Sequence, residues 1–220
     1  MGDVNLKLLI SIKSFEEAMK IKDCNFDILD IKNPAEGSLG ANYPVVIKNI
    51  AENIDNYPIS AAGGDLDNKI GAASLITYGL AHTDVDYIKL GLYGVREKEE
   101  AKKLLEEAVK ALKLSGGKSR LIAAAYADFR EENTLSPFIL NELAFETEID
   151  GIMIDTFNKE AKNLFDFLSA EELNSFVSKA EQAGVLSALA GSLRIHHLDK
   201  LTTIDPDIIG FRGAVCTGND

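Results

Sequence analysis

Asp30 and Lys32 share one face of an otherwise apolar, Ile-rich stretch, residues 26–32 (FDILDIK). Such a stretch predicts a strand that is covered on both faces, on which side chains two residues apart point the same way. Asn33-Pro34 ends it, because proline has no N–H to donate and restricts the residue before it. Opposite charges on a buried strand are unfavourable unless they pair or do chemistry. A structural salt bridge and a catalytic pair both remain open.

The elements that position these residues follow from the alternation of short apolar runs with amphipathic segments along the whole chain. The expected strands cover residues 6–12, 26–32, 58–62, 86–92, 120–126, 151–155, 186–190 and 208–211. The expected helices cover residues 15–21, 45–53, 69–81, 97–114, 137–145, 164–183 and 195–201. We expect Gly63-Gly64 to break the third strand. Eight strands alternating with helices, without a hairpin signal, predict an α/β fold, a (β/α)8 TIM barrel that forms one catalytic domain over residues 1–220.

A weak internal repeat suggests how the charges are arranged. The second, fourth, sixth and eighth expected strands each open on an aspartate followed by apolar residues (DILDIK, DYIKLG, DGIMID and DIIGFR). Barrel interiors are layered, with each layer taking side chains from alternate strands. If the four strands are in phase, one layer holds Asp30, Lys89, Met153 and Gly210, and the next holds Lys32, Gly91, Asp155 and Arg212. Polar groups then gather at the C-terminal mouth.

Lysines that face a barrel interior beside aspartates suit imine chemistry. A desolvated lysine, or one near another cation, has a lowered pKa and attacks a carbonyl as the free amine. The iminium withdraws electrons, and a second lysine or an aspartate can then act as acid or base. Lys159, four residues beyond Asp155, would add a third cation at the mouth. Lysines at barrel mouths also simply bind anions, so both roles remain open.

A phosphate site is expected in the loops after the seventh and eighth strands, where barrels often hold this group. The first loop contains Gly191 and Ser192, and the second contains Arg212 and Gly213. Small residues let backbone N–H groups approach an anion, and Arg212 could add charge if it faces the site. Ordinary tight turns are the alternative.

Other polar residues carry weaker signals. His196 and His197 are expected on a solvated helix face rather than in a metal site, because no Glu or Cys stands at ligand spacing. Tyr126 and Asp128, at the end of the fifth strand, could either reach the mouth or serve as a core tyrosine and a loop-starting aspartate.

Composition limits the partners and the compartment. The net charge of −12 argues against nucleic acid or an anionic membrane as partner. No apolar run is long enough to span a bilayer, and no signal peptide precedes the first strand. Cys24 and Cys216 match no metal spacing and suggest buried thiols in a reducing compartment. We therefore expect a cytoplasmic protein.

Six sequence blocks (DIKNPAEGSLGANYP, DYIKLGLYG, AAAYADF, IMIDTFNKEAKNLFDFL, ALAGSLR and IIGFRGAVCTG) together resemble the (5-formylfuran-3-yl)methyl phosphate synthase family. This is the methanofuran-biosynthesis family also called 4-(hydroxymethyl)-2-furancarboxaldehyde-phosphate synthase. The resemblance runs from the first strand to the last residue. It implies a barrel lyase that condenses two molecules of glyceraldehyde 3-phosphate into a phosphorylated furan aldehyde, with loss of water and one phosphate.

The same resemblance implies roles for individual residues. Lys32 would form the Schiff base, Lys89 would transfer protons, and Asp30, Asp155 and Lys159 would support them. The Ala-Gly-Ser and Arg-Gly-Ala segments would bind phosphate. We expect triose phosphate as the substrate, no metal or organic cofactor, and a homo-oligomer.

Two departures from the family pattern stand out. Residues 61–71 (AAGGDLDNKIG) are less similar than the other blocks, so no role is carried over there. The sequence ends at Asp220, where the family continues into a last helix, so that helix is expected to be missing from this chain. A simple class I aldolase and a non-catalytic sugar-phosphate-binding barrel are the competing interpretations.

Overall fold

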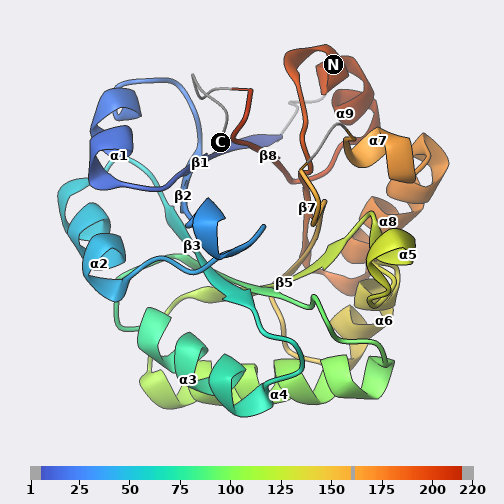
Figure 1. The fold of residues 1–220 in the computed structure, drawn as a ribbon, viewed down its shortest axis with the longest axis horizontal. Helices are drawn as coiled ribbons and strands as arrows, with labels where there is room; N and C mark the ends of the chain where they lie inside the picture. The colour runs from blue at the N-terminus through green and yellow to red at the C-terminus, as the bar shows by residue number, and fades with distance from the viewer. Residues whose placement is uncertain (1–5, 160–161, 215–220) are drawn as a thin grey trace.

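The computed structural model describes residues 6–159 and 162–214. Eight parallel strands close into a barrel in sequence order, and the helices surround it (Figure 1). This confirms the predicted TIM barrel. The strands are β1 (Lys7–Ile12), β2 (Ile28–Ile31), β3 (Ile59–Asp65), β4 (Tyr87–Gly91), β5 (Arg120–Tyr126), β6 (Gly151–Asp155), β7 (Leu186–Leu189) and β8 (Ile208–Phe211).

The helical elements lie between consecutive strands and mostly agree with the predicted ranges. They are α1 (Phe15–Ile21), η1 (Pro34–Glu36), α2 (Pro44–Asn53), α3 (Ile70–Leu80), α4 (Lys98–Ser115), α5 (Phe129–Glu132), α6 (Ile139–Glu146), α7 (Leu164–Phe167), α8 (Ala170–Ala183), η2 (Ile195–His197) and α9 (Leu198–Ile204). The helical region expected over residues 164–183 consists of two helices, α7 and α8. Ser169 starts α8 as its N-cap by accepting a hydrogen bond from the Glu172 N–H, which separates α8 from α7.

The third strand does not break at Gly63-Gly64, contrary to expectation. β3 continues to Asp65, and its register against β4 shifts between Ala62 and Asp65. Gly64 has φ +102°, a conformation that side chains rarely adopt. A bulge of this kind redirects the residues that follow it, so Asp65 is placed by this irregularity.

The barrel interior changes character along its axis. Leu9, Ile28, Ile122, Met153 and Ile208 belong to an apolar inner cluster that fills the barrel. A second, larger cluster packs between the strands and the surrounding helices. The charged interior side chains lie above the apolar filling, toward the C-terminal ends of the strands.

The aspartates of the internal repeat have a shared structural role at the opposite end of the barrel. Each carboxylate accepts a hydrogen bond from a backbone N–H in the preceding strand. The pairs are Asp27 with Leu8 (2.7 Å), Asp86 with Ile59 (2.7 Å), Asp150 with Leu121 (2.8 Å) and Asp207 with Ser187 (2.8 Å). These hydrogen bonds connect each even-numbered strand to the strand before it. The shared aspartate therefore has a structural role, and it keeps the four even-numbered strands in phase.

Three further expectations concern the surface and the end of the chain. In the described ranges, no helix is long and apolar enough to cross a membrane. Cys24 is exposed, so its expected burial is wrong. Cys216 and the chain end at residues 217–220 lie outside the described residues.

Replacing Asp150 with alanine tests the fastening role. The variant loses the carboxylate acceptor of the Leu121 N–H, so we expect the free energy of unfolding to fall by about 1 kcal/mol. Urea unfolding measures this. Asp55→Ala, at another exposed aspartate, should leave the stability unchanged. Equal losses in both variants would contradict the role.

Candidate active site

A cavity of about 470 Å³ opens at the C-terminal ends of the strands. Its charged and polar lining includes Lys32, Ser38, Lys89, Asp155, Lys159 and Arg212. These side chains come from β4, β6 and the ends or following segments of β2, β6 and β8. The structure thus brings most of the predicted charged residues to one site.

The lower layer of charges joins β2 to β4. Lys89 Nζ lies 2.7 Å from Asp30 Oδ1, and both side chains are buried. Ser11 Oγ donates to the other carboxylate oxygen of Asp30 at 2.8 Å. The small residues Ser60 and Ala62 of β3 pair in register with Asp30 and Lys89, which leaves room for the ion pair between the flanking strands.

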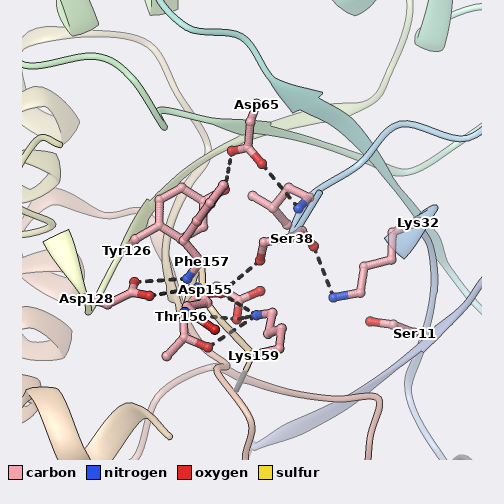
Figure 2. Close-up of polar contacts among 12 residues, drawn as sticks. Ser11, Lys32, Ser38, Asp65, Tyr126, Asp128, Asp155, Thr156, Phe157 and Lys159 are labelled. Atoms are coloured by element: carbon pink, nitrogen blue, oxygen red, sulfur yellow. Dashed lines mark hydrogen bonds and ion pairs between the residues drawn. The ribbon is translucent and has the colours of Figure 1, made fainter. Parts of the chain in front are cut away.

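Lys32 lies one layer higher and has a different environment. It is 8% exposed, and its Nζ donates to the Ser38 carbonyl at 3.3 Å (Figure 2). Burial lowers the pKa of Lys32 to about 8; the Asp155 carboxylate opposes this fall, and the Lys159 and Lys89 charges add to it. A substantial fraction of Lys32 is therefore the neutral amine near pH 8.

Asp155 and Lys159 form a second ion pair across the cavity from Lys32. Lys159 Nζ lies 2.5 Å from Asp155 Oδ1, which also accepts the Thr156 N–H at 2.7 Å. Burial alone would raise the pKa of Asp155, but the Lys159 and Lys32 charges and these hydrogen bonds hold it below its usual value. Asp155 therefore stays ionised beside Lys159.

The two residues at the end of β5 support this site from behind. Asp128 is buried and accepts the N–H groups of Phe157 (2.9 Å) and Asn158 (2.8 Å). It thereby anchors the segment that carries Lys159. Tyr126 is fully buried, and its hydroxyl donates to Asp65. Neither residue lines the cavity. Tyr126 is therefore the core tyrosine of the alternative interpretation, and Asp128 is the loop-starting aspartate that precedes α5.

The predicted phosphate residues all line the cavity. Gly191 has φ +112° and Ser192 has φ +48°. A Cβ on Gly191 would lie 2.8 Å from Thr156 Cγ2, so only glycine fits without displacing β6. Arg212 lies in the wall, but its guanidinium contacts Glu17 of α1 and the Ser11 carbonyl, each at 3.2 Å. Its charge is thus held toward α1.

The sequence analysis missed basic residues that line the same cavity. Arg194 Nη1 donates to the Gly213 carbonyl at 2.6 Å and so connects the loops after β7 and β8. Lys162 and His196 also lie in the lining. Arg194 was within reach of sequence reasoning, because it ends the ALAGSLR block.

The expectation that both histidines lie on a solvated face is wrong for His197. It is 8% exposed, its Nδ1 accepts the Arg194 N–H at 3.1 Å, and burial lowers its pKa. Among the residues that the structure describes, no group of three or more His, Cys, Asp or Glu could hold a metal ion.

Comparison with known sequences gives one consistent family. The model of the family described as 4-HFC-P synthase matches residues 8–220. Three relatives bear the name (5-formylfuran-3-yl)methyl phosphate synthase. That of Methanosarcina barkeri is 41% identical (97% of this chain, 92% of the relative), that of Archaeoglobus fulgidus 41% (97% and 92%), and that of Methanothermobacter thermautotrophicus 42% (97% and 90%).

Solved structures share the fold at low sequence identity. A 3-hexulose-6-phosphate synthase superposes with a TM-score of 0.63 at 16% identity, covering 95% of this chain and 91% of that one. An aldolase named QR15 gives 0.69 at 14%, covering 97% and 93%. At these identities the likeness supports the barrel fold alone.

The charges around Lys32 predict opposite shifts in two variants. Asp155→Asn removes a carboxylate that stabilises the Lys32 ammonium, so the pKa of Lys32 should fall below about 8. Lys159→Met removes a repelling cation, so that pKa should rise. The pH dependence of Lys32 acetylation, followed by peptide mass spectrometry, measures both. Lys162→Met, at the cavity rim, should leave the pKa of Lys32 unchanged. Shifts of the same sign in Asp155→Asn and Lys159→Met would contradict the opposite effects assigned to these two charges.

Proposed function

Because this chain belongs to the 4-HFC-P synthase family, we propose that it condenses two molecules of glyceraldehyde 3-phosphate through an imine on Lys32. The product would be (5-formylfuran-3-yl)methyl phosphate, the furan aldehyde of methanofuran biosynthesis. The chain covers about nine-tenths of the relatives' length. Four of the charged residues proposed to act line its cavity, and the fifth, Asp30, is buried beside Lys89.

One observation carries the choice of Lys32. Lys89 is 2.7 Å from Asp30 and Lys159 is 2.5 Å from Asp155, so each ammonium has a carboxylate beside it. Lys32 instead donates to a neutral carbonyl, and burial lowers its pKa to about 8. An imine-forming lysine must attack as the free amine. Of the three lysines, Lys32 is the one that can lose its proton without leaving a paired carboxylate behind.

The first half of the proposed reaction uses the lower layer. The Lys32 amine attacks the aldehyde carbon of one triose, and water leaves to give an iminium. Lys89, after passing a proton to Asp30, removes the C2 proton of this triose, and the electron pair of that C–H bond forms an enamine that expels the C3 phosphate. The resulting enol attacks through C3 the ketone carbon of the second triose, in its dihydroxyacetone-phosphate-like form, which gives the branched carbon skeleton of the product.

The second half uses the upper pair. Lys159 lies beside Asp155 at the more open side of the cavity, where it protonates the oxygen formed by aldol addition. Closure of the free hydroxymethyl oxygen of the second triose onto C2 of the first, with loss of two water molecules, yields the furan, and hydrolysis of the imine releases Lys32. Gly191, Ser192 and Gly213 offer backbone groups to the phosphates, with Arg212 and Arg194 in the same wall.

Product analysis tests this function against its competitors. We expect glyceraldehyde 3-phosphate to yield free phosphate and a conjugated furan aldehyde, which absorbs ultraviolet light where the triose does not. Lys32→Met should lower turnover at least about a thousandfold. Lys103→Met, on the exposed face of α4, should have no effect. An acyclic product would indicate a simple aldolase, and saturable binding without turnover would indicate a sugar-phosphate sensor.

A further inference from the structure

Asp65 is a carboxylate behind the wall of the cavity, and it interacts with two other elements. The β3 bulge directs its side chain so that Oδ1 accepts the Tyr126 hydroxyl of β5 (Figure 2). Its Oδ2 accepts the Leu39 N–H at 3.5 Å. Asp65 does not line the cavity, so it reaches the chemistry only through Leu39 and its neighbours.

The neighbouring strand and loop are shaped to admit this carboxylate. A Cβ on Gly91 of β4 would overlap Oδ1 of Asp65. A Cβ on Gly37 would lie 3.4 Å from Oδ2, and Gly37 itself has φ +120°. Gly91 therefore provides the space that the Asp65 side chain occupies, whereas Gly37 is favoured for its backbone conformation. Gly91 belongs to the upper layer of the barrel interior. It has to be a glycine there because the Asp65 carboxylate occupies the place of a side chain.

The segment that Asp65 holds, residues 37–40, covers Lys32. The Ser38 carbonyl accepts from Lys32 Nζ at 3.3 Å, and Ser38 Oγ donates to the Thr156 carbonyl of the β6 loop at 2.9 Å. The Leu39 side chain is 1% exposed and belongs to the apolar inner cluster. This segment thus connects Lys32 to the loop that carries Lys159 and keeps water away from the amine.

We propose that Asp65, oriented by Tyr126, is a positioning residue that fixes residues 37–40 as the cover of Lys32. The proposal rests on the function proposed above, in which Lys32 is the nucleophile. Asp65 does not touch substrate; it acts through the Leu39 N–H, which sets the place of the Ser38 carbonyl and of the Leu39 side chain.

A carboxylate suits this position better than its amide analogue. Two donors, the Tyr126 hydroxyl and the Leu39 N–H, point at the two oxygens of Asp65. Asparagine offers one oxygen and would place its NH2 group against one of those donors. Burial raises the pKa of Asp65, and the two hydrogen bonds oppose that rise.

Titration of Lys32 in Asp65→Asn tests the proposal. Burial is the largest cause of the lowered pKa of Lys32, so loosening the cover should move that pKa upward from about 8 by roughly one unit. Trace acetylation with acetic anhydride as a function of pH, read by peptide mass spectrometry, reports this without any triose. Tyr126→Phe should shift the pKa the same way by a smaller amount.

Two control variants distinguish a specific effect of Asp65 on the cover of Lys32 from a general loosening of the barrel. Asp86→Asn removes a carboxylate that accepts a backbone N–H at the other end of the same strand β3. Tyr93→Phe is the control for Tyr126→Phe, because the Tyr93 hydroxyl donates to Glu132 and not to Asp65. Neither should move the Lys32 titration. An unshifted Lys32 in folded Asp65→Asn, or an equal shift in Asp86→Asn, overturns the proposal.

A second variant guards against misfolding of Asp65→Asn, and activity separates the two proposals. Gly91→Ala displaces the Asp65 carboxylate without removing it, and it should give the same upward shift. In the triose assay, Asp65→Asn should lower kcat roughly tenfold with little change in KM, because the phosphate loops are untouched. Wild-type protein that makes no furan would refute the proposed function, while the Lys32 titration would still decide the role of Asp65.

Discussion

The gathering of three lysines at one barrel mouth, with Lys32 and Lys89 buried there, is the constraint on which the rest of this structure depends. Charges removed from water must be paired or must lose their charge. Asp30 pairs with Lys89 and Asp155 pairs with Lys159, while Lys32 donates to a carbonyl and has its pKa lowered to about 8. The site therefore places two lysines beside carboxylates and the third, Lys32, beside a neutral carbonyl with a lowered pKa, an arrangement that suits the proposed imine chemistry.

The barrel supports this arrangement with apolar filling below and anchored segments above. Ile28, two residues before Asp30 on the same face of β2, belongs to the apolar inner cluster that fills the barrel. Above it, Asp128 anchors the segment that leads to Lys159 by accepting the Phe157 and Asn158 N–H groups. Asp65 has the corresponding proposed role for the segment after β2, residues 37–40, where it accepts the Leu39 N–H. In this account, carboxylates that do not line the cavity hold the segments that do.

The sequence predicted the fold and the lower layer because both follow from periodicity. Apolar runs gave the eight strands, and the aspartates that open alternate strands gave their phase, which placed Asp30 beside Lys89. Asp65 was missed because its position depends on a bulge at Gly63-Gly64, and a glycine pair does not reveal whether a strand ends or bends. The burial of His197 was missed because it depends on packing with other loops.

The central claim is that Lys32 forms the imine. Incubation with glyceraldehyde 3-phosphate and borohydride, followed by intact mass measurement and peptide mapping, tests it most directly. We expect one reduced triose adduct, on the peptide containing Lys32. An adduct on Lys89 instead would contradict the assignment of the nucleophile, and binding without an adduct on any lysine would contradict the imine mechanism itself.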